Sequence, residues 1–554
     1  MWRMKKNRLL WQVPVLVVIL FVLSILGINY WAKWRLQQAI AHLPEKTING
    51  LYHIKVSNSY LNIWNGEWVI TDVSVQTDTA AWYTLRTQWP DSFPPLLSMS
   101  LKGMKIGNFN WIQYFYGREA HVRSLEIESP VIAAFTKKDT TQNDPSNLRS
   151  QLLALPELLA PFTALLHVRK TSINDASIYI RTIQAPGDTS FQEIQHAHLY
   201  IKDTRIKRQA EEVTYCKELE LSAVHVKTVF RRNTQMIEFG DFKFSKKGRL
   251  FSMQQFAFTP LRSEQAFFED IGVRKAYFKF NCAEIVGRGF DLDRFIRYNY
   301  LYMDSLRVQE PVMRFTINKM LPLPYRKLLP HEMVARISNT FHIGALVVKD
   351  GDILLTNRVP GRDFLISFNH SYITATNLSN DPLMMDARNP LDIRAESRLM
   401  NQSPIQLTMH IPLRSEQFDA DYTATIEALP LDVLNPVLDH KRLSIKSGYL
   451  QSAEIKSVIR NGMATGTVQM QYRNLQVAIM KKDTGKTRKV VSKIANMLLN
   501  EDNEKDDPSN FIVGNISLAR TRQEEYFAFL WHSIQTGMLP SVMPALKKVR
   551  SPES

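Results

Sequence analysis

The sequence predicts a mainly β protein in which a single N-terminal transmembrane helix precedes a large, antiparallel, strand-rich body. First, Leu9–Ala32 is a run of 24 residues without a charged side chain. Second, alternation of apolar and polar residues with period two dominates the rest of the 554-residue chain. Third, helical periodicity is confined to a few short segments. Together these patterns favour antiparallel sheets with one apolar and one polar face.

The run at residues 9–32 has the length and flanks of a membrane anchor. At 1.5 Å per residue a helix of this length measures about 36 Å, whereas the hydrocarbon core is about 30 Å thick. The centre of the run consists of Val15, Leu16, Val17, Val18, Ile19, Leu20, Phe21, Val22 and Leu23. Four cations lie in residues 1–8, so the positive-inside rule places this tail in the cytoplasm and the body across the membrane. A cleaved signal peptide is the alternative, but no small-residue cleavage site follows the run.

Composition limits the possible classes of partner. The net charge of +16 is spread along the chain without a Lys/Arg-rich run in the body, so no nucleic-acid partner is expected. Cys216 and Cys282 are the only cysteines, and they provide no disulfide framework, although they could pair with each other. Beyond the anchor, the predicted divisions are a β-rich region at 33–335, a second β-rich region at 336–486, and a C-terminal region at 487–554.

The clearest strand pair is a hairpin at residues 405–428. The side chains expected on its apolar face are Ile405, Leu407, Met409, Ile411, Leu413, Phe418, Tyr422 and Ile426, and the alternating segment 464–479 adds Val468 and Met470. These ten residues are the candidate lipid-contacting set. Alternation alone does not decide whether they line an open groove or a sealed sandwich core.

The remaining elements are few. Helices are expected at 150–166, 292–306, 487–499 and 526–536, the last of these packed against the body, and residues 500–510 are expected to form a mobile acidic loop. A final strand is expected in the C-terminal region. Ile173–Ile180 and Ile343–Leu355 share a pattern of apolar strand, short polar turn and apolar strand, which suggests an internal repeat.

No motif of catalysis or cofactor binding stands out. The sequence has no GxSxG, P-loop or GxGxxG pattern. His196 and His198 have a spacing found in some metal sites, but no third ligand is evident, and Asp203 is expected to be a solvated acid. The sequence therefore indicates no catalytic, metal or cofactor residues.

The order of these landmarks resembles the AsmA-like envelope proteins of Gram-negative bacteria. The resemblance is carried by the N-terminal anchor and by the segments Leu125–Phe135, Ile173–Ile180, Ile343–Asn357, Phe364–Leu378, Pro430–Leu438, Ile445–Leu450, Gly466–Leu475, Gly514–Arg520 and Tyr526–Gly537. It implies an elongated, curved, taco-like groove of antiparallel strands with a few flanking helices, anchored in the inner membrane and extending into the periplasm.

The resemblance also implies a function without catalysis. Such a protein holds or conducts phospholipid acyl chains toward the outer membrane. The partners expected are membrane phospholipids, the inner membrane and an envelope protein at the C-terminal end. Two alternatives stay open at this point. One is a scaffold that assists outer-membrane protein assembly or envelope integrity without carrying lipid. The other is a membrane-anchored hydrolase.

Overall fold

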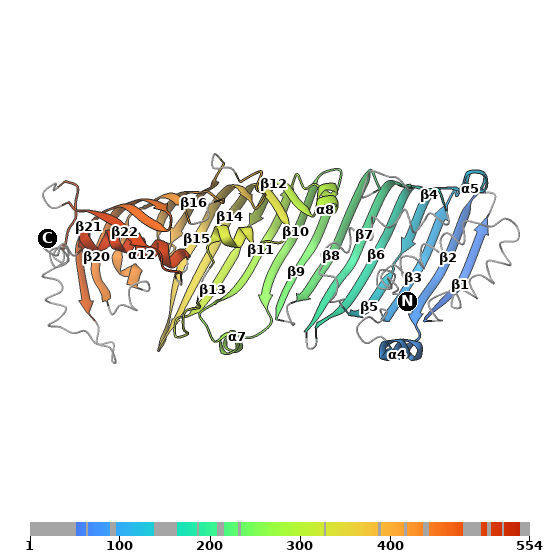
Figure 1. The fold of residues 1–554 in the computed structure, drawn as a ribbon, viewed down its shortest axis with the longest axis horizontal. Coiled ribbons are helices and arrows are strands. Elements are labelled where there is room, and N and C mark those ends of the chain that lie inside the picture. Colours follow the sequence, from blue (N-terminus) through green and yellow to red (C-terminus); the bar gives the residue numbers. More distant parts are fainter. Residues whose placement is uncertain are drawn as a thin grey trace, which may run out of the picture. The chain divides into compact units, whose positions relative to one another are not determined.

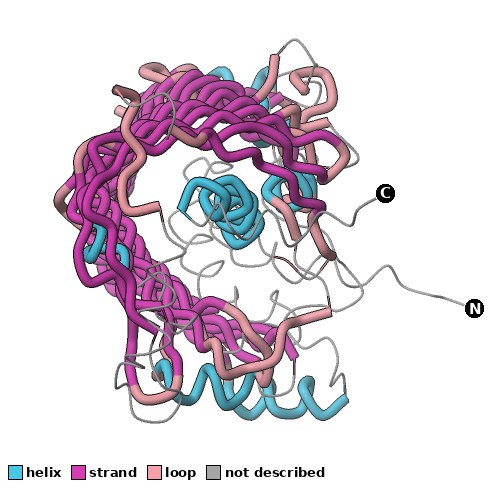
Figure 2. Tube along the Cα trace, turned by 90° about the vertical axis from the view of Figure 1, so that its left-hand side faces the viewer, coloured by secondary structure: helices cyan, strands magenta, loops and turns pink. Residues whose placement is uncertain are grey.

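The structure, a computed structural model, confirms that the protein is mainly β. It describes residues 51–62, 65–88, 96–137, 163–185, 188–207, 215–230, 234–325, 328–385, 389–414, 418–435, 443–479, 500–506, 511–522, 524 and 526–542. Of these residues, 65% lie in strands and 14% in helices, which Figure 2 shows in magenta and cyan. The chain divides into two compact units. Unit 1 comprises residues 1–261 and 286–302, and unit 2 comprises residues 262–285 and 303–554.

Within its described residues, unit 1 has ten complete strands and three short helices (Figure 1). The strands are β1 (Tyr52–Asn62), β2 (Glu67–Thr77), β3 (Leu96–Gly107), β4 (Glu119–Glu128), β5 (Val131–Lys137), β6 (Leu165–Ala185), β7 (Asp188–Lys207), β8 (Glu218–Phe230), β9 (Gln235–Ser245) and β10 (Leu250–Pro260). The helices are α4 (Thr79–Gln88), α5 (Trp111–Gly117) and α8 (Leu292–Tyr298).

The strand ladder of unit 1 is mixed, which corrects the expectation of a purely antiparallel sheet. Strands β1, β2 and β3 pair in antiparallel fashion, and so do β6 through β10. Strands β4 and β5 both pair antiparallel with β3 but run parallel to β6. A parallel pair needs a connection of about a dozen residues or more, and residues 138–164 supply it between β5 and β6.

Unit 2 repeats the mixed character. Its strands are β13 (Val312–Asn318), β14 (Thr340–Val359), β15 (Arg362–Ser379), β16 (Leu391–Leu399), β17 (Ser403–Ile411), β18 (Ala420–Ile426), β19 (Leu429–Pro430), β20 (Leu443–Arg460), β21 (Met463–Ile479) and β22 (Val513–Ala519). Strands β11 (Ala276–Arg288) and β12 (Tyr300–Gln309) have residues in both units. Strands β13 and β14 are parallel, and β14 to β18 and β20 to β22 pair antiparallel. The helices are α7 (Glu264–Ile271), α9 (Pro330–Ala335) and α12 (Tyr526–Val542), with a 3-10 turn at Leu431–Leu434.

Three expected segments differ from the structure. The helix expected at 292–306 ends at Tyr298, because Asn299 adopts a left-handed conformation that caps α8 and leads into β12. The helix expected to begin at residue 526 does so and continues to Val542. In the acidic segment 500–510, Asn503 is fully buried and its amide donates to the Met470 carbonyl at 2.6 Å, so residues 500–506 are attached to β21 rather than free. The helix expected at 487–499 lies outside the described residues, as does most of 150–166.

The suggested internal repeat extends over a longer stretch than the two segments named above. Helices α5 and α8 are capped alike: the side chains of Asn110 and Asp291 cap their N-termini, and a residue in the left-handed conformation caps each C-terminus. A strand follows each helix, and after it come a left-handed residue and a proline. These are Ser129-Pro130 and Glu310-Pro311. The Ser129 and Glu310 amides each donate at 2.8 Å to a carbonyl of the following long strand, Asn174 and Lys349.

The long strands repeat a second feature. Asp175 of β6 and His196 of β7 both have a left-handed backbone conformation, and Oδ1 of Asp175 lies 2.7 Å from Nδ1 of His196. Asp350 of β14 and His370 of β15 are left-handed too, and the same two atoms lie 2.8 Å apart. Left-handed conformations are uncommon for residues with a Cβ, although Asn, Asp and His adopt them more often than most. The equivalent position of four such residues indicates two copies of one strand module.

Candidate functional site

Two rows of apolar side chains cross unit 1 in strand register. Row A consists of Ile54, Val75, Met99, Ile132, Ile178, Ile194, Val226 and Phe239, each paired with the next. Row B consists of Ile70, Met104, Ile127, Ile173, Leu199, Leu221, Phe244 and Phe251, also paired in sequence. Since neighbouring strands are about 4.8 Å apart, eight strands give each row a length of roughly 34 Å along the sheet.

Both rows lie on the same face because the strands are bulged between them. The rows are five residues apart, for example Ile173 and Ile178 in β6, and an odd separation places side chains on opposite faces of a regular strand. A bulge at the left-handed Asp175 changes the register between those two residues. Ile173, Ile194 and Val226 accordingly pack in one cluster, around the small buried side chains of Ala176, Ala197 and Ala223.

The opposite face of the same strands is polar. The row next to row A consists of Gln76, Ser98, Ala133, Tyr179, Glu193, Lys227 and Glu238. Ion pairs connect neighbouring strands, such as Lys202 with Glu218 at 3.2 Å. Unit 1 therefore presents an apolar and a polar face, as the alternation in the sequence predicts.

Exposure changes along the rows. In β1 to β3 the row residues are buried, as Ile70 and Val75 show, except for Met99, which is partly buried, and they belong to compact clusters around Trp68 and Trp82. In β6 to β9, by contrast, Ile178, Ile194, Leu199, Val226 and Phe239 remain partly exposed. We call the stretch of rows A and B in β6 to β10 the apolar face.

Aromatic rings extend the apolar face at β9 and β10. The rings of Phe239 and Phe256 stack with their centroids 6.1 Å apart and their planes 13° apart. The ring centroids of Phe242 and Phe239 lie 5.9 Å apart, and those of Phe258 and Phe230 lie 6.4 Å apart. All five rings are partly exposed, so this end of the face offers a large, shape-adaptable apolar surface.

Unit 2 carries a shorter apolar arrangement of the same type. One row consists of Phe280, Met313, Ile353, Phe368 and Leu399, and the next consists of Phe278, Phe315, Leu355 and Ile366. Their neighbours Lys279 and Arg314 occupy the other face and are exposed. Leu399 belongs to the buried core that continues into β16 to β22.

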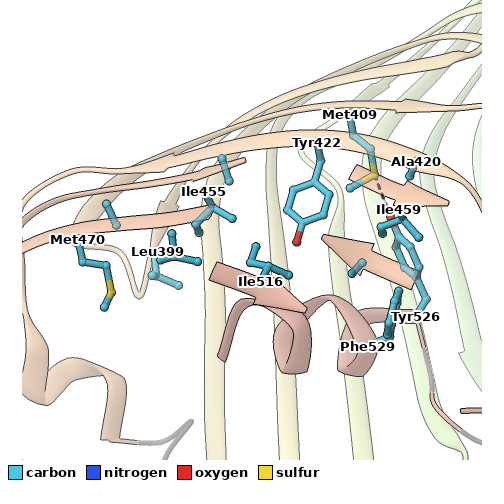
Figure 3. Close-up of a cluster of buried hydrophobic side chains, with 14 of the residues drawn as sticks. Leu399, Met409, Ala420, Tyr422, Ile455, Ile459, Met470, Ile516, Tyr526 and Phe529 are labelled. Carbon is cyan, nitrogen blue, oxygen red and sulfur yellow. Dashed lines mark hydrogen bonds between the residues drawn. The ribbon is translucent and has the colours of Figure 1, made fainter. Parts of the chain in front are cut away.

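The ten candidate residues from the sequence all lie in that buried core. Met409, Ile411, Leu413, Phe418, Tyr422, Val468 and Met470 are buried, and Ile405, Leu407 and Ile426 pack against them. Helix α12 covers this part of the sheet. Phe529 is fully buried, and the Tyr526 hydroxyl lies 2.9 Å from the Met409 sulfur (Figure 3). The Ser533 and Tyr422 hydroxyl oxygens lie 3.3 Å apart. The structure thus brings the ten residues together but places them in a covered core, where a ligand does not reach the buried ones.

The accessible apolar face was missed from the sequence because its strands are bulged. The alternation at 125–135 and 197–201 is visible in the sequence. At each bulge, however, the apolar side chains change from odd to even positions or the reverse, so each strand reads as short, unconnected alternating pieces. The signal in the sequence is a residue that tolerates the left-handed conformation, such as Asp175 or His196, between two apolar runs. Such a residue predicts a bulge and therefore one continuous strand instead of two.

The cysteines and Asp203, which the sequence analysis singled out, lie in buried or ion-paired surroundings. No group of three or more His, Cys, Asp or Glu side chains in the described ranges is arranged to hold a metal ion. Cys216 and Cys282 are buried free thiols, and burial raises the pKa of Cys282 to about 11. Asp203 is not a solvated acid, because Lys217, His167 and Arg205 all contact its carboxylate and hold its pKa below the usual range.

Comparison with known proteins does not identify a family. No family model matches the chain, and no curated protein matches it. In the part of the chain that the structure describes, no helix is long and apolar enough to cross a bilayer. The apolar segment centred on Val15–Leu23 lies outside the described residues.

Proposed function

We propose that this protein is a non-enzymatic, membrane-anchored envelope protein that holds or conducts phospholipid acyl chains on an apolar sheet face. The observation that carries the proposal is the pair of registered rows, A and B, which are partly exposed in β6 to β9 while the reverse face of the same strands is polar. Soluble monomers rarely expose a contiguous apolar surface of this kind without a binding role.

The dimensions of the apolar face suit an acyl chain. One leaflet of a bilayer contributes about 15 Å, half of a hydrocarbon core of about 30 Å. The apolar face runs across the five strands β6 to β10, or roughly 19 Å at about 4.8 Å per strand spacing, so it offers apolar contacts over more than the depth of one leaflet. A row of side chains without convergent polar groups binds the hydrocarbon but leaves the headgroup in water.

The energy gained is sufficient for transfer. Moving a 16-carbon chain through water costs about 0.8 kcal/mol per CH₂, or roughly 12 kcal/mol. An apolar face that covers roughly half of the chain's surface removes about 6 kcal/mol of that cost. Because the rows have no deep polar pocket, neighbouring positions bind with similar strength, and a chain can move along them.

The cellular setting of the proposal comes from the sequence. The apolar segment at residues 9–32 and the cations before it support an inner-membrane anchor with the N-terminus in the cytoplasm and the body in the periplasm. The AsmA-like resemblance supports phospholipid as the cargo and the outer membrane as the destination. A partner at the C-terminal end is supported by Phe527 of α12, whose side chain is largely exposed.

The test uses the full-length chain, purified in mild detergent, with bound phospholipid quantified by mass spectrometry. Leu221→Asp places a charge in row B, and Ser222→Asp places the same charge one residue away on the polar face, opposite Lys243. We expect Leu221→Asp to lower co-purified phospholipid at least fivefold and Ser222→Asp to leave it unchanged.

Two results contradict the proposal: a wild-type protein without bound phospholipid, or an equal loss of phospholipid in both variants. The first result, combined with specific protein partners in crosslinking experiments, would favour the scaffold alternative. Far-UV circular dichroism of each variant checks that the sheet is intact.

A further inference from the structure

Two histidines on parallel strands face each other on the polar side of unit 1. His121 of β4 and His167 of β6 are register partners, and their Nδ1 atoms are 3.3 Å apart. Their neighbours in the same register, Val122 and Val168, belong to the buried core around Trp68. Since successive side chains alternate between faces, the imidazoles lie on the face opposite that core.

The outer nitrogen of each ring faces a carboxylate. His121 Nε2 lies 3.1 Å from Glu119, and His167 Nε2 lies 2.7 Å from Asp203. Lys217 Nζ and Arg205 Nε also contact the Asp203 carboxylate, at 2.6 and 3.1 Å. An ionised carboxylate accepts a hydrogen bond, so each Nε2 carries the ring proton.

That proton arrangement leaves a lone pair on each Nδ1, directed toward the other ring. Two lone pairs at 3.3 Å repel each other unless a proton or a cation lies between the rings. Two nitrogen ligands of a tetrahedral Zn²⁺, each about 2.0–2.1 Å from the metal, are themselves about 3.3–3.4 Å apart. A carboxylate on the far nitrogen of a ligating histidine is the usual support of such sites, because it orients the ring and raises its basicity.

We propose that His121 and His167 form a two-histidine site for a divalent transition metal of the Zn²⁺ class, with Glu119 and Asp203 as supporting carboxylates. Imidazole is a preferred ligand of these metals. The rings are 27% and 15% exposed, so water completes the coordination. Bound metal connects β4 to β6 and stabilises the folded state by mass action. The site is on the polar face and does not depend on the proposed lipid function.

The experiment titrates the full-length, detergent-solubilised protein with Zn²⁺ by calorimetry and with Co²⁺ by visible absorption, after removal of metal by a chelator. We expect saturable binding of one ion per chain and a tetrahedral Co²⁺ spectrum. His121→Ala and His167→Ala should each weaken binding at least tenfold, and Glu119→Gln should weaken it about tenfold to a hundredfold.

The matched control is His225→Ala. His225 also faces a carboxylate, Glu238, at 3.8 Å, and is similarly exposed. This variant should bind Zn²⁺ like the wild type. The proposal is overturned if the wild type does not bind one metal ion per chain. A proton shared between the two rings would then account for the 3.3 Å between their Nδ1 atoms. An equal loss of binding in His225→Ala would also overturn the proposal. The wild-type titration decides the matter even where an alanine variant does not fold.

Discussion

A single added methyl group should release α12 from the sheet. Gly514 of β22 and Gly537 of α12 meet where the helix crosses the strand. A Cβ placed on Gly514 would lie 1.6 Å from the Gly537 carbonyl oxygen and 2.6 Å from its carbonyl carbon. These atoms belong to the backbone of a helix, so no side-chain rotation relieves the overlap. In Gly514→Ala the helix has to move away from the strand.

The size of the effect follows from these distances. Optimal contacts between heavy atoms are about 3.5–4.0 Å long, so the helix must retreat by roughly 2 Å. A retreat of that size opens the contacts of Phe529 and Tyr526, which are buried against β17 to β22. Overpacking of a well-packed core typically costs about 1–3 kcal/mol. Local opening of α12 should therefore become easier by this amount.

Hydrogen exchange followed by mass spectrometry measures that opening directly in the full-length protein. A loss of about 1–3 kcal/mol corresponds to amide exchange in α12 that is roughly 5- to 150-fold faster. Gly103→Ala is the matched control, because its added Cβ would meet no atom closer than 3.8 Å and the residue lies in β3 of unit 1. Exchange in α12 should be unchanged there. Exchange in α12 of Gly514→Ala that stays within twofold of the wild type would contradict the prediction.

Three further predictions concern single side chains. Asn503→Ala should destabilise the contact between segment 500–506 and β21 by about 1–3 kcal/mol, because the Met470 carbonyl and the Ile512 amide lose the hydrogen bonds that the Asn503 side chain makes with them. Hydrogen exchange in that segment should therefore become faster. Burial lowers the pKa of His331, whose ring stacks on Phe418, below its usual 6.5, so the folded state resists its protonation. Thermal stability should fall as the pH decreases from about 6.5, and His331→Phe should reduce that pH dependence. Asp350→Asn should change the thermal unfolding temperature little, because Asn also tolerates the left-handed conformation of this residue, and because the carboxylate and its partner His370 are both exposed and such pairs contribute at most about 1 kcal/mol.

Much of the strand content was predictable because the alternation of apolar and polar residues is local information. The hairpin at 405–428 illustrates this, since β17 and β18 pair with Met409 opposite Tyr422 as the alternation requires. Strand direction was less predictable. Strands β4 and β5 are parallel to β6 because a long connection precedes β6, and alternation does not report the direction of a partner strand.

The site was harder to predict than the fold. Row A and row B lie on the same face only because a bulge in the strands between them restores the side-chain direction, and a bulge depends on the backbone angle of one residue such as Asp175. The His121–His167 pair likewise depends on the parallel register of two strands that are 46 residues apart in sequence. Neither feature has a short motif.

The two-faced character of the strands is encoded locally, since period-two alternation places apolar and polar residues on opposite sides wherever a strand forms. The sequence also contains the charge pattern around residues 9–32 that suggests an anchor. Which apolar residues are covered depends instead on how distant segments pack. Ser533 reaches Tyr422 from 111 residues away and α12 covers that surface, whereas the rows in β6 to β9 stay partly exposed. Burial depends on long-range packing of separate segments, and the local periodicity is the same for a covered face and an exposed one.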